Sequence, residues 1–287
     1  MGFLQIMRPK QWTKNLIIYA GLVFSNHLLD INLIIITTIG FFLFCLFSSC
    51  VYIINDILDR EKDAVHHKKK YRPIPSGKIT VSQAFVFGVI LFIFSFGCAL
   101  LLNPTFALVG FIYFLLITLY SFVLKHLVII DVMTIAMGFI LRAVAGTVLI
   151  GVRISPWLLS CTLLLSMFLA LNKRRSELLA VDVDKVNTRK ILKEYSPELV
   201  RDMINIVTAS TVMAYALYTF TSEHTTYMMV TIPFVIYGVF RYQYILHKKG
   251  KKGLGESPEL ILLKDLPLVL NIFLWVLTCI VILYIFD

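Results

Sequence analysis

Charged residues are scarce in this chain of 287 residues: 15% are Asp, Glu, Lys or Arg, whereas 59% are hydrophobic. A water-soluble globular domain carries about 25% charged residues, so this composition excludes one. The charges are grouped between long apolar runs, which also excludes a disordered chain, a collagen-like repeat and a coiled coil. The composition therefore predicts a protein that crosses a lipid bilayer many times.

Cysteine is also scarce, and its placement excludes two further kinds of site. The five cysteines all lie in apolar runs, and none forms a CxxC or CxxH pair. The sequence therefore indicates neither a zinc site nor a disulfide framework. The first apolar run lacks a small-x-small cleavage site, so we expect a retained first span rather than a signal peptide.

Apolar runs long enough to cross about 30 Å of hydrocarbon predict about nine helices. The expected fold class is all-α, a polytopic membrane protein that forms a single integral-membrane domain over residues 1–287. The expected spans are residues 14–29, 32–57, 81–102, 105–124, 128–150, 156–174, 199–221, 226–246 and 266–286.

Basic residues lie almost entirely on one side of this bundle. With the N-terminus in the cytoplasm, 25 of the 27 Lys and Arg residues fall on the cytoplasmic side, and only Arg142 and Arg153 do not. The positive-inside rule thus predicts a membrane protein with its C-terminus outside and its site facing the cytoplasm. The expected location is a bacterial-type plasma membrane. The basic residues that give the net charge of +10 lie next to the spans. This placement is typical of charge that faces anionic lipid, so we expect no nucleic-acid partner.

An acidic array closes the second predicted span. Asn55, Asp59 and Asp63 are one helical turn apart on one face, and Asp56 lies one step round from Asn55. Like charges at this spacing repel each other, and Mg²⁺ bound by a few carboxylates and substrate phosphate relieves the repulsion. The array is therefore a candidate Mg²⁺–diphosphate site. The alternative is a solvated acidic helix end that neighbouring cations offset.

A basic and conformationally restricted loop follows directly. Residues 66–78 read HHKKKYRPIPSGK, in which two prolines and a glycine stiffen and turn the chain. Arg72 offers a planar fork for a phosphate, with a positive-inside anchor as the alternative. Lys68–Lys70 are typical positive-inside anchors. An acidic metal site beside such a loop suits a polyanionic substrate.

A short turn between the fourth and fifth spans holds two more candidates, Tyr120 and Lys125. A lone Lys at the end of a span is usually an interfacial anchor. Two other roles stay open for Lys125, an ion pair with Asp131 and a substrate contact.

Arg142 lies about 20 Å into the fifth span, where a charge usually faces a cavity or a partner. Gly138 and Gly146 share its helical face. A tight helix contact in which Arg142 bonds to carbonyl groups is therefore the alternative to a phosphate or lipid head-group contact.

A third cluster, KRRSEL at 173–178, ends the sixth predicted span. Cations at the C-terminus of a helix satisfy both the helix dipole and the positive-inside rule. Lys173, Arg174 and Glu177 also share a helical face, so an anion site supported by one carboxylate is the functional interpretation.

These residues resemble the UbiA superfamily of intramembrane transferases. Asn55, Asp59 and Asp63 match its first motif, NxxxDxxxD, and the likeness covers the whole chain. The stretches RPKQWTKN at 8–15, RPIPSG at 72–77, KRRSEL at 173–178 and GESPE at 255–259 are similar to those of its decaprenyl-phosphate phosphoribosyltransferase branch. The resemblance implies nine helices around a polar cavity that faces the cytoplasm.

The same resemblance implies the reaction and the residues that perform it. The reaction would be Mg²⁺-dependent transfer of 5-phosphoribose from phosphoribosyl diphosphate to a polyprenyl (decaprenyl or undecaprenyl) phosphate, giving a lipid carrier for cell-wall glycan synthesis. Mg²⁺ ligands would be Asn55, Asp56, Asp59 and Asp63, of which the three aspartates are also the catalytic set. Substrate contacts would come from Lys14, Asn15, Arg72, Tyr120, Lys125, Arg142, Lys173, Arg174 and Glu177.

One departure from the family pattern separates this branch from ordinary UbiA prenyltransferases. Those carry a second aspartate-rich motif where this chain reads KRRSEL. Cations in place of carboxylates favour direct recognition of a further phosphate over a second metal. A prenyltransferase that acts on an aromatic or other small acceptor is the alternative function. A polyprenyl-phosphate carrier without catalysis is a third, which the short, charge-poor outer loops disfavour. The oligomeric state stays open, a homo-oligomer included.

Overall fold

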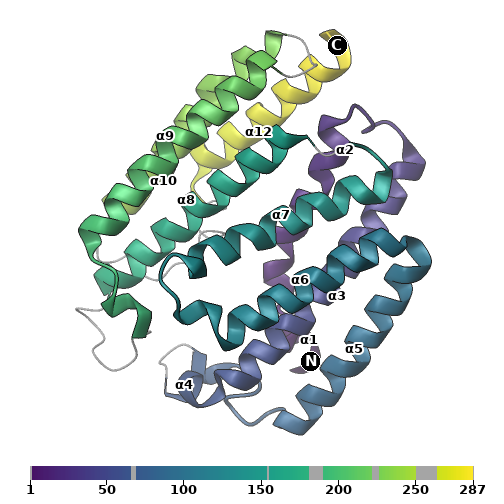
Figure 1. The fold of residues 1–287 in the computed structure, drawn as a ribbon, viewed down its shortest axis with the longest axis vertical. Helices are drawn as coiled ribbons and strands as arrows, with labels where there is room; N and C mark the ends of the chain where they lie inside the picture. The colour runs from purple at the N-terminus through teal and green to yellow at the C-terminus, as the bar shows by residue number, and fades with distance from the viewer. Residues whose placement is uncertain are drawn as a thin grey trace. The chain divides into compact units, whose positions relative to one another are not determined.

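The structure is a computed structural model that describes residues 2–65, 69–153, 155–180, 190–221, 226–249 and 264–286. Every regular element in these ranges is helical (Figure 1), which confirms the all-α prediction. Eight of the helices there are long and apolar enough to cross a membrane. The chain divides into two compact units, Met1–Ile154 and Ser155–Asp287. A single domain over 1–287 stays a prediction, and residues 66–68 and 255–259 lie outside the described ranges.

The first unit is built around one long helix, α3. Its N-terminus is capped by the Asp30 carboxylate, which accepts from the amides of Asn32 and Leu33. Thr80 and Gln83 form a capping box at the start of α5. The elements are α1 (Gly2–Ile6), η1 (Pro9–Tyr19), α2 (Ala20–Phe24), α3 (Ile31–Leu58), α4 (Arg60–Ala64), η2 (Lys69–Tyr71), α5 (Val81–Leu102), α6 (Pro104–Phe122), η3 (Leu124–His126) and α7 (Ile130–Ile150).

The first predicted span, 14–29, was placed wrongly. The helical segment begins at Pro9 and ends at Phe24, and η1 is an unusually long 3-10 helix of 11 residues, followed by 5 residues of α2. A 3-10 helix rises about 2.0 Å per residue against 1.5 Å for an α-helix, so the two pieces together extend roughly 30 Å. This segment is therefore long enough to cross the hydrocarbon of a bilayer, although it has fewer residues than any of the eight membrane-length helices in the described ranges.

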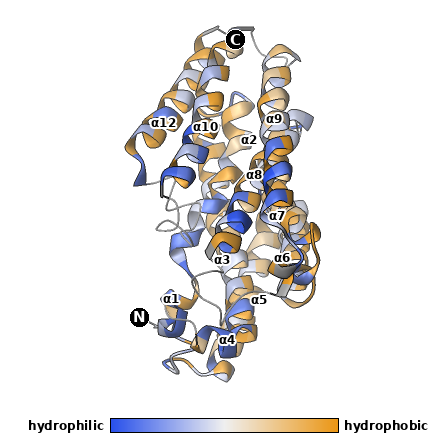
Figure 2. Ribbon diagram, turned by 90° about the vertical axis from the view of Figure 1, so that its left-hand side faces the viewer, coloured by the Kyte–Doolittle hydropathy of each residue, from blue (hydrophilic) through white to orange (hydrophobic). Residues whose placement is uncertain are grey.

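The core of the first unit packs aromatic rings between α3, α6 and α7. Phe44 and Phe47 of α3 and Phe106 and Tyr113 of α6 are almost fully buried, and the rings of Phe44 and Tyr113 lie 4.8 Å apart. In contrast, only 11% of the apolar stretch of α5 is buried inside the protein. Such an exposed apolar helix fits contact with lipid. Figure 2 shows the hydrophilic residues of α4 in blue, beyond the apolar part of α3.

The described part of the second unit contains three long helices and a shorter fourth one. Tyr215 ties three elements together, because its hydroxyl accepts from Trp275 Nε1 at 2.9 Å and bonds Thr231 at 2.7 Å. Arg241 donates twice to Asp265, whose carboxylate also caps the last helix. The elements are α8 (Pro156–Ala180), η4 (Lys190–Lys193), α9 (Pro197–Thr221), η5 (Thr226–Thr231), α10 (Ile232–Lys249), α12 (Leu266–Val281) and a final turn (Ile282–Phe286).

Candidate active site

The predicted acidic array lies where α3 gives way to α4. The helix is not continuous there, as the spacing argument had assumed, because α3 ends at Leu58 and Asp59 is its C-cap. The backbone nevertheless keeps helical spacing, since Asp59 N bonds to Asn55 O at 2.9 Å and Asp63 N bonds to Asp59 O at 2.8 Å. The four predicted side chains therefore stay within two turns of each other.

Asp56 is buried, with 2% of its surface exposed, and it contacts two guanidinium groups. Arg8 approaches with a fork, in which Nε donates to Oδ2 at 3.2 Å and Nη2 contacts Oδ1. Arg72 Nη1 donates to Oδ1 at 3.1 Å. A buried carboxylate is costly unless it is paired, so these two arginines account for the burial of Asp56.

Asp63 is buried in the same way, with 3% exposed. The same Nη1 atom of Arg72 contacts Asp63 Oδ2, and Lys69 Nζ lies 3.5 Å from Oδ1. Arg72 therefore bridges Asp56 and Asp63, which are two helical turns apart. The basic loop reaches the acidic array as its sequence position suggested, although through Lys69 as well as Arg72.

Asp59 turns to a different partner. Lys125 Nζ donates to Asp59 Oδ1 at 2.9 Å, and Lys125 is buried with 8% exposed. This ion pair joins the end of α3 to η3, so an exposed interfacial anchor does not describe Lys125. Asp131, the other partner considered for Lys125, is fully buried at the start of α7.

The turn after Lys125 is conformationally strained. Ile129 has φ 69° and ψ −47°, and Ile130 N bonds to Val128 O at 2.8 Å. A three-residue turn of this kind is rare, and positive φ is a clear outlier for a β-branched residue. Strain of this sort gathers near functional sites, and here it lies four residues from the Lys125–Asp59 pair.

The arrangement of the carboxylates supports a metal site in part. Among the residues that the structure describes, no three His, Cys, Asp or Glu side chains are grouped closely enough to hold a metal ion. However, Asp56 and Asp63 both contact one nitrogen atom of Arg72, so a cation at that position would meet oxygens of both. Hard carboxylate oxygens are what Mg²⁺ prefers. Asn55, half-buried one turn before Asp59, is the neutral oxygen donor of the predicted set.

Arg142 lies in a separate buried network whose contacts are neutral. Its Nε donates to Asn15 Oδ1, its Nη1 to Gly138 O and its Nη2 to the Tyr113 hydroxyl, all at 2.7 Å. Its guanidinium carbon also lies 4.6 Å from the centre of the Tyr113 ring. With 5% exposed, Arg142 joins η1, α6 and α7, which is the carbonyl-bonded arrangement considered as its alternative.

Asn15 is fully buried and works within this same network. Its amide nitrogen donates to Cys45 Sγ and Ser48 Oγ of α3, both at 3.2 Å. Lys14 and Tyr120, the remaining candidates of the first unit, are each half-buried. Roles in substrate binding stay predictions for Asn15, Arg142 and these two residues.

The third cluster lies inside α8 rather than at its end, because this helix continues to Ala180. Arg174 is almost fully buried and pairs with Glu177 at 2.5 Å, whereas Lys173 is exposed. The shared face inferred from spacing thus brings Arg174 and Glu177 together in the second unit. An anion-binding role for the three residues stays a prediction.

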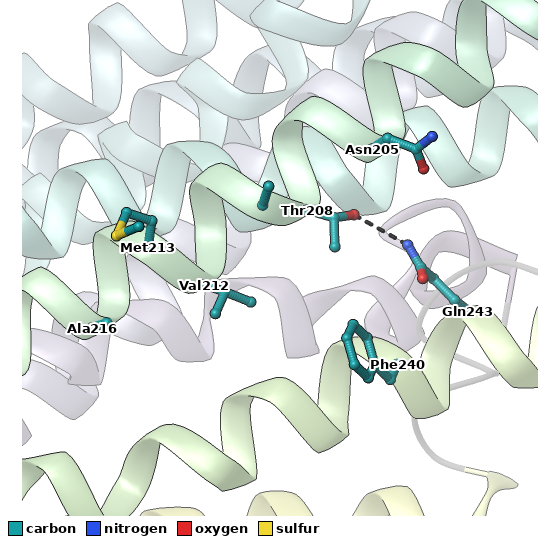
Figure 3. Close-up of a pocket in the computed structure, with 8 residues that line it drawn as sticks. Asn205, Thr208, Val212, Met213, Ala216, Phe240 and Gln243 are labelled. Atoms are coloured by element: carbon teal, nitrogen blue, oxygen red, sulfur yellow. Dashed lines mark hydrogen bonds between the residues drawn. The ribbon is translucent and has the colours of Figure 1, made fainter.

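A groove of about 570 Å³ lies between α9 and α10 of the second unit (Figure 3). Thr208 and Gln243 are hydrogen-bonded across it at 3.1 Å, and Val212, Met213 and Phe240 make up much of the remaining lining. None of the described residues that line it is charged. This groove therefore suits hydrocarbon rather than phosphate, and the candidate active site is the charged cluster of the first unit.

Two cationic contacts of the acidic array were not among the predicted site residues, Arg8 and Lys69. Arg8 lies 48 positions before Asp56, so no local spacing connects them. One signal was present: Cys45, Ser48 and Asp56 place small and polar side chains along one face of an otherwise apolar helix. Such a face requires a polar partner, and η1 with its flanking residues is that partner.

In the part of the chain that the structure describes, all regular elements are helical, eight helices have membrane length, and a charged cluster is buried at a helix end. These features define an integral-membrane protein with a polar site. Residues 15–256 match the UbiA prenyltransferase family. The chain belongs to this family, and it is therefore a multi-pass membrane transferase.

Known relatives and solved structures agree with that assignment. The decaprenyl-phosphate phosphoribosyltransferase of Corynebacterium glutamicum is 33% identical over 295 residues, which cover 99% of this chain and 87% of that protein. A 4-hydroxybenzoate octaprenyltransferase of Shewanella loihica is 34% identical, but over 32% of this chain and 32% of that protein. A UbiA homolog from Archaeoglobus fulgidus, solved with GPP and Mg²⁺, has a TM-score of 0.75 at 20% identity and covers 99% of this chain and 100% of its own.

Proposed function

We propose that this protein transfers 5-phosphoribose from phosphoribosyl diphosphate to a polyprenyl phosphate. The observation that carries this proposal is the extent of the likeness. Similarity to the relative named decaprenyl-phosphate phosphoribosyltransferase runs over 99% of the chain, whereas similarity to the octaprenyltransferase runs over 32%. A shared membrane scaffold explains the second likeness, and only the first extends to the whole protein.

The charges of the site support a substrate with several phosphates. Three carboxylates, Asp56, Asp59 and Asp63, contact four cations, Arg8, Lys69, Arg72 and Lys125. In these contacts among the described residues, cations therefore outnumber carboxylates by one. Phosphoribosyl diphosphate carries a diphosphate at C1 and a phosphate at C5, and both groups suit Arg forks and Lys point charges.

The proposed reaction needs no general base. An oxygen of the acceptor phosphate, already anionic near neutral pH, forms a bond to the ribose C1 while the bond from C1 to the diphosphate oxygen breaks. Diphosphate leaves with the electron pair. The protein then has two tasks, to hold donor and acceptor in line and to stabilise the charge that develops on the leaving group.

Asp56 and Asp63, with Asp59 and Asn55 beside them, are the residues proposed to hold Mg²⁺. The metal would supply positive charge to the leaving diphosphate. With bound Mg²⁺ balancing the charge of their carboxylate partners, Arg72 and Lys125 would be free to turn toward phosphate oxygens. The cations that pair with the carboxylates in the ligand-free protein would thus become phosphate ligands.

The distribution of Lys and Arg supports a cytoplasmic position for this site in a bacterial plasma membrane. A soluble sugar phosphate donor would reach it from that side, and the isoprenoid chain of the acceptor would stay in the bilayer. The phosphoribosyl lipid would then serve as a carrier for cell-envelope glycan synthesis.

Donor choice tests the proposal. Purified protein in nanodiscs is given Mg²⁺ and either labelled phosphoribosyl diphosphate with decaprenyl phosphate, or a labelled prenyl diphosphate with 4-hydroxybenzoate. We expect label to enter the lipid phase only from the first pair. If prenyl transfer occurs and phosphoribosyl transfer does not, the protein is a prenyltransferase, as the solved archaeal homolog bound to GPP would then suggest.

A further inference from the structure

Arg8 combines an unusual backbone with an unusual partner. It lies before the start of the family match at residue 15. Its backbone is left-handed, with φ 53° and ψ 60°, a conformation that residues other than glycine rarely adopt. From that position its guanidinium forks onto Asp56, and its central carbon lies 5.2 Å from the centre of the Tyr52 ring, one turn earlier on α3.

Cations outnumber carboxylates in the contacts that the described residues make with Asp56 and Asp63. Two buried carboxylates contact three cations, Arg8, Lys69 and Arg72. A divalent cation that entered with no anion would add two charges where cations already outnumber carboxylates, and it would find Asp56 engaged on both oxygens. Binding of metal alone is therefore unfavourable. A diphosphate group brings several negative charges and reverses this balance.

We propose that Arg8 is a positioning residue that reserves Asp56 for metal that arrives with diphosphate. It occupies Asp56 in the ligand-free protein, and when metal and diphosphate bind together it exchanges the carboxylate for a diphosphate oxygen. This inference rests on the proposed function for the identity of the anion. It makes metal affinity and diphosphate affinity depend on each other, and such coupling is reciprocal by thermodynamic necessity.

The exchange predicts opposite effects of one substitution on two affinities. Arg8→Gln removes a cation from Asp56, so Mn²⁺, used as the probe for Mg²⁺, should bind the ligand-free protein roughly 5- to 10-fold more tightly. The same variant has lost a partner for diphosphate, so methylenebisphosphonate in saturating Mg²⁺ should bind roughly 5- to 10-fold more weakly. A role confined to packing would weaken both affinities or neither.

The measurements use the full-length protein in detergent and do not depend on turnover. Free Mn²⁺ is followed by electron paramagnetic resonance, and bisphosphonate binding is followed by isothermal titration calorimetry. Arg153→Gln is the matched control, because Arg153 is an exposed arginine beyond the C-terminal end of α7, and both affinities should stay within twofold of wild type. Arg8→Lys keeps the charge without the fork and should lie between wild type and Arg8→Gln.

Each outcome decides the inference. The inference is supported if Arg8→Gln shifts the Mn²⁺ and bisphosphonate affinities in opposite directions. The thermal midpoint of Arg8→Lys should then equal that of wild type, which shows that the fork is not needed for folding. An unchanged or weaker Mn²⁺ affinity in a folded Arg8→Gln protein overturns it and leaves phosphoribosyl transfer standing. If Asp56→Asn and Asp63→Asn bind Mn²⁺ as wild type does, these residues are not the metal site, and the inference falls together with that part of the proposed function.

Discussion

Lys125 and Asp59 are 66 positions apart in the chain, yet Lys125 Nζ donates to Asp59 Oδ1 at 2.9 Å. The pair fixes the carboxylate at the point where α3 ends and ties it to η3. Because Lys125 is buried, removal of its charge leaves Asp59 without this bond and lets the end of the helix move.

We therefore expect Lys125→Met to lower kcat/KM for phosphoribosyl diphosphate about 100-fold, the cost of a displaced catalytic group. Lys125→Arg should keep part of the activity, since it keeps the charge. Lys78→Met is the control, because Lys78 is an exposed lysine of the nearby loop, and its kcat/KM should stay within twofold of wild type. Wild-type kinetics in Lys125→Met would show that the pair has no part in catalysis.

The strain at Ile129 can be measured by comparing two truncations. Ile129→Ala and Ile129→Gly both remove a side chain that is 45% exposed, but only glycine adopts the positive φ without cost. We expect Ile129→Gly to be more stable than Ile129→Ala by roughly 1 kcal/mol, seen as a higher thermal midpoint in detergent. Equal midpoints would mean that the turn stores no strain.

Gly146 allows η1 to lie directly against α7. A Cβ at this position would lie 2.0 Å from Ile18 O and 2.8 Å from Ile18 C, both backbone atoms that cannot rotate away. Gly146→Ala should therefore push η1 outward, destabilise the protein by about 1–3 kcal/mol and lower activity, because the same segment places Asn15 and Arg8.

Gly97→Ala is the matched comparison for that substitution. Gly97 lies in the interior of α5, where an alanine methyl group would have no atom of the described residues within 4 Å outside its own stretch of helix. Alanine is also the better helix former by about 1 kcal/mol, so the thermal midpoint should equal or exceed that of wild type. If Gly146→Ala behaves like Gly97→Ala, the close approach of η1 is not required.

Arg142 can be assigned to structure or to substrate binding through Tyr113. Tyr113→Phe removes only the hydroxyl that accepts from Arg142 Nη2 at 2.7 Å. If Arg142 is a brace, this change lowers the thermal midpoint by the equivalent of about 1–2 kcal/mol and leaves KM for both substrates within twofold. A raised KM at an unchanged midpoint would instead make Arg142 a substrate ligand.

The sequence was sufficient for most of the fold because membrane-length apolar runs and end caps are local signals. Residues 81–102 were predicted with the bounds that α5 has, and the capping box at Thr80 explains its sharp start. The first span was placed five residues too far along the chain, because the apolar run begins after Lys14 whereas the helical segment, also 16 residues long, begins at Pro9 and includes Lys10 and Lys14.

The site was only partly predictable, because several of its contacts join segments that are distant in the sequence. The i, i+4 spacing predicted Asp59 and Asp63 as site residues, and the composition of the loop predicted Arg72. The pairing of Arg8 with Asp56 and of Lys125 with Asp59 depends on how distant segments pack. Hydropathy also marked Arg142 as exceptional, but only its contacts show that neutral groups surround it.

The most direct test of the account measures phosphoribosyl transfer in variants of the bridged carboxylates. Labelled phosphoribosyl diphosphate, decaprenyl phosphate and Mg²⁺ are given to wild type, Asp56→Asn, Asp63→Asn and, as control, Asp30→Asn, which keeps a capping side chain at the opposite end of α3. We expect transfer by wild type and Asp30→Asn, its loss with EDTA, and at least a roughly 100-fold decrease in the other two variants. Undiminished transfer in Asp56→Asn and Asp63→Asn, or transfer that survives EDTA, would contradict the account.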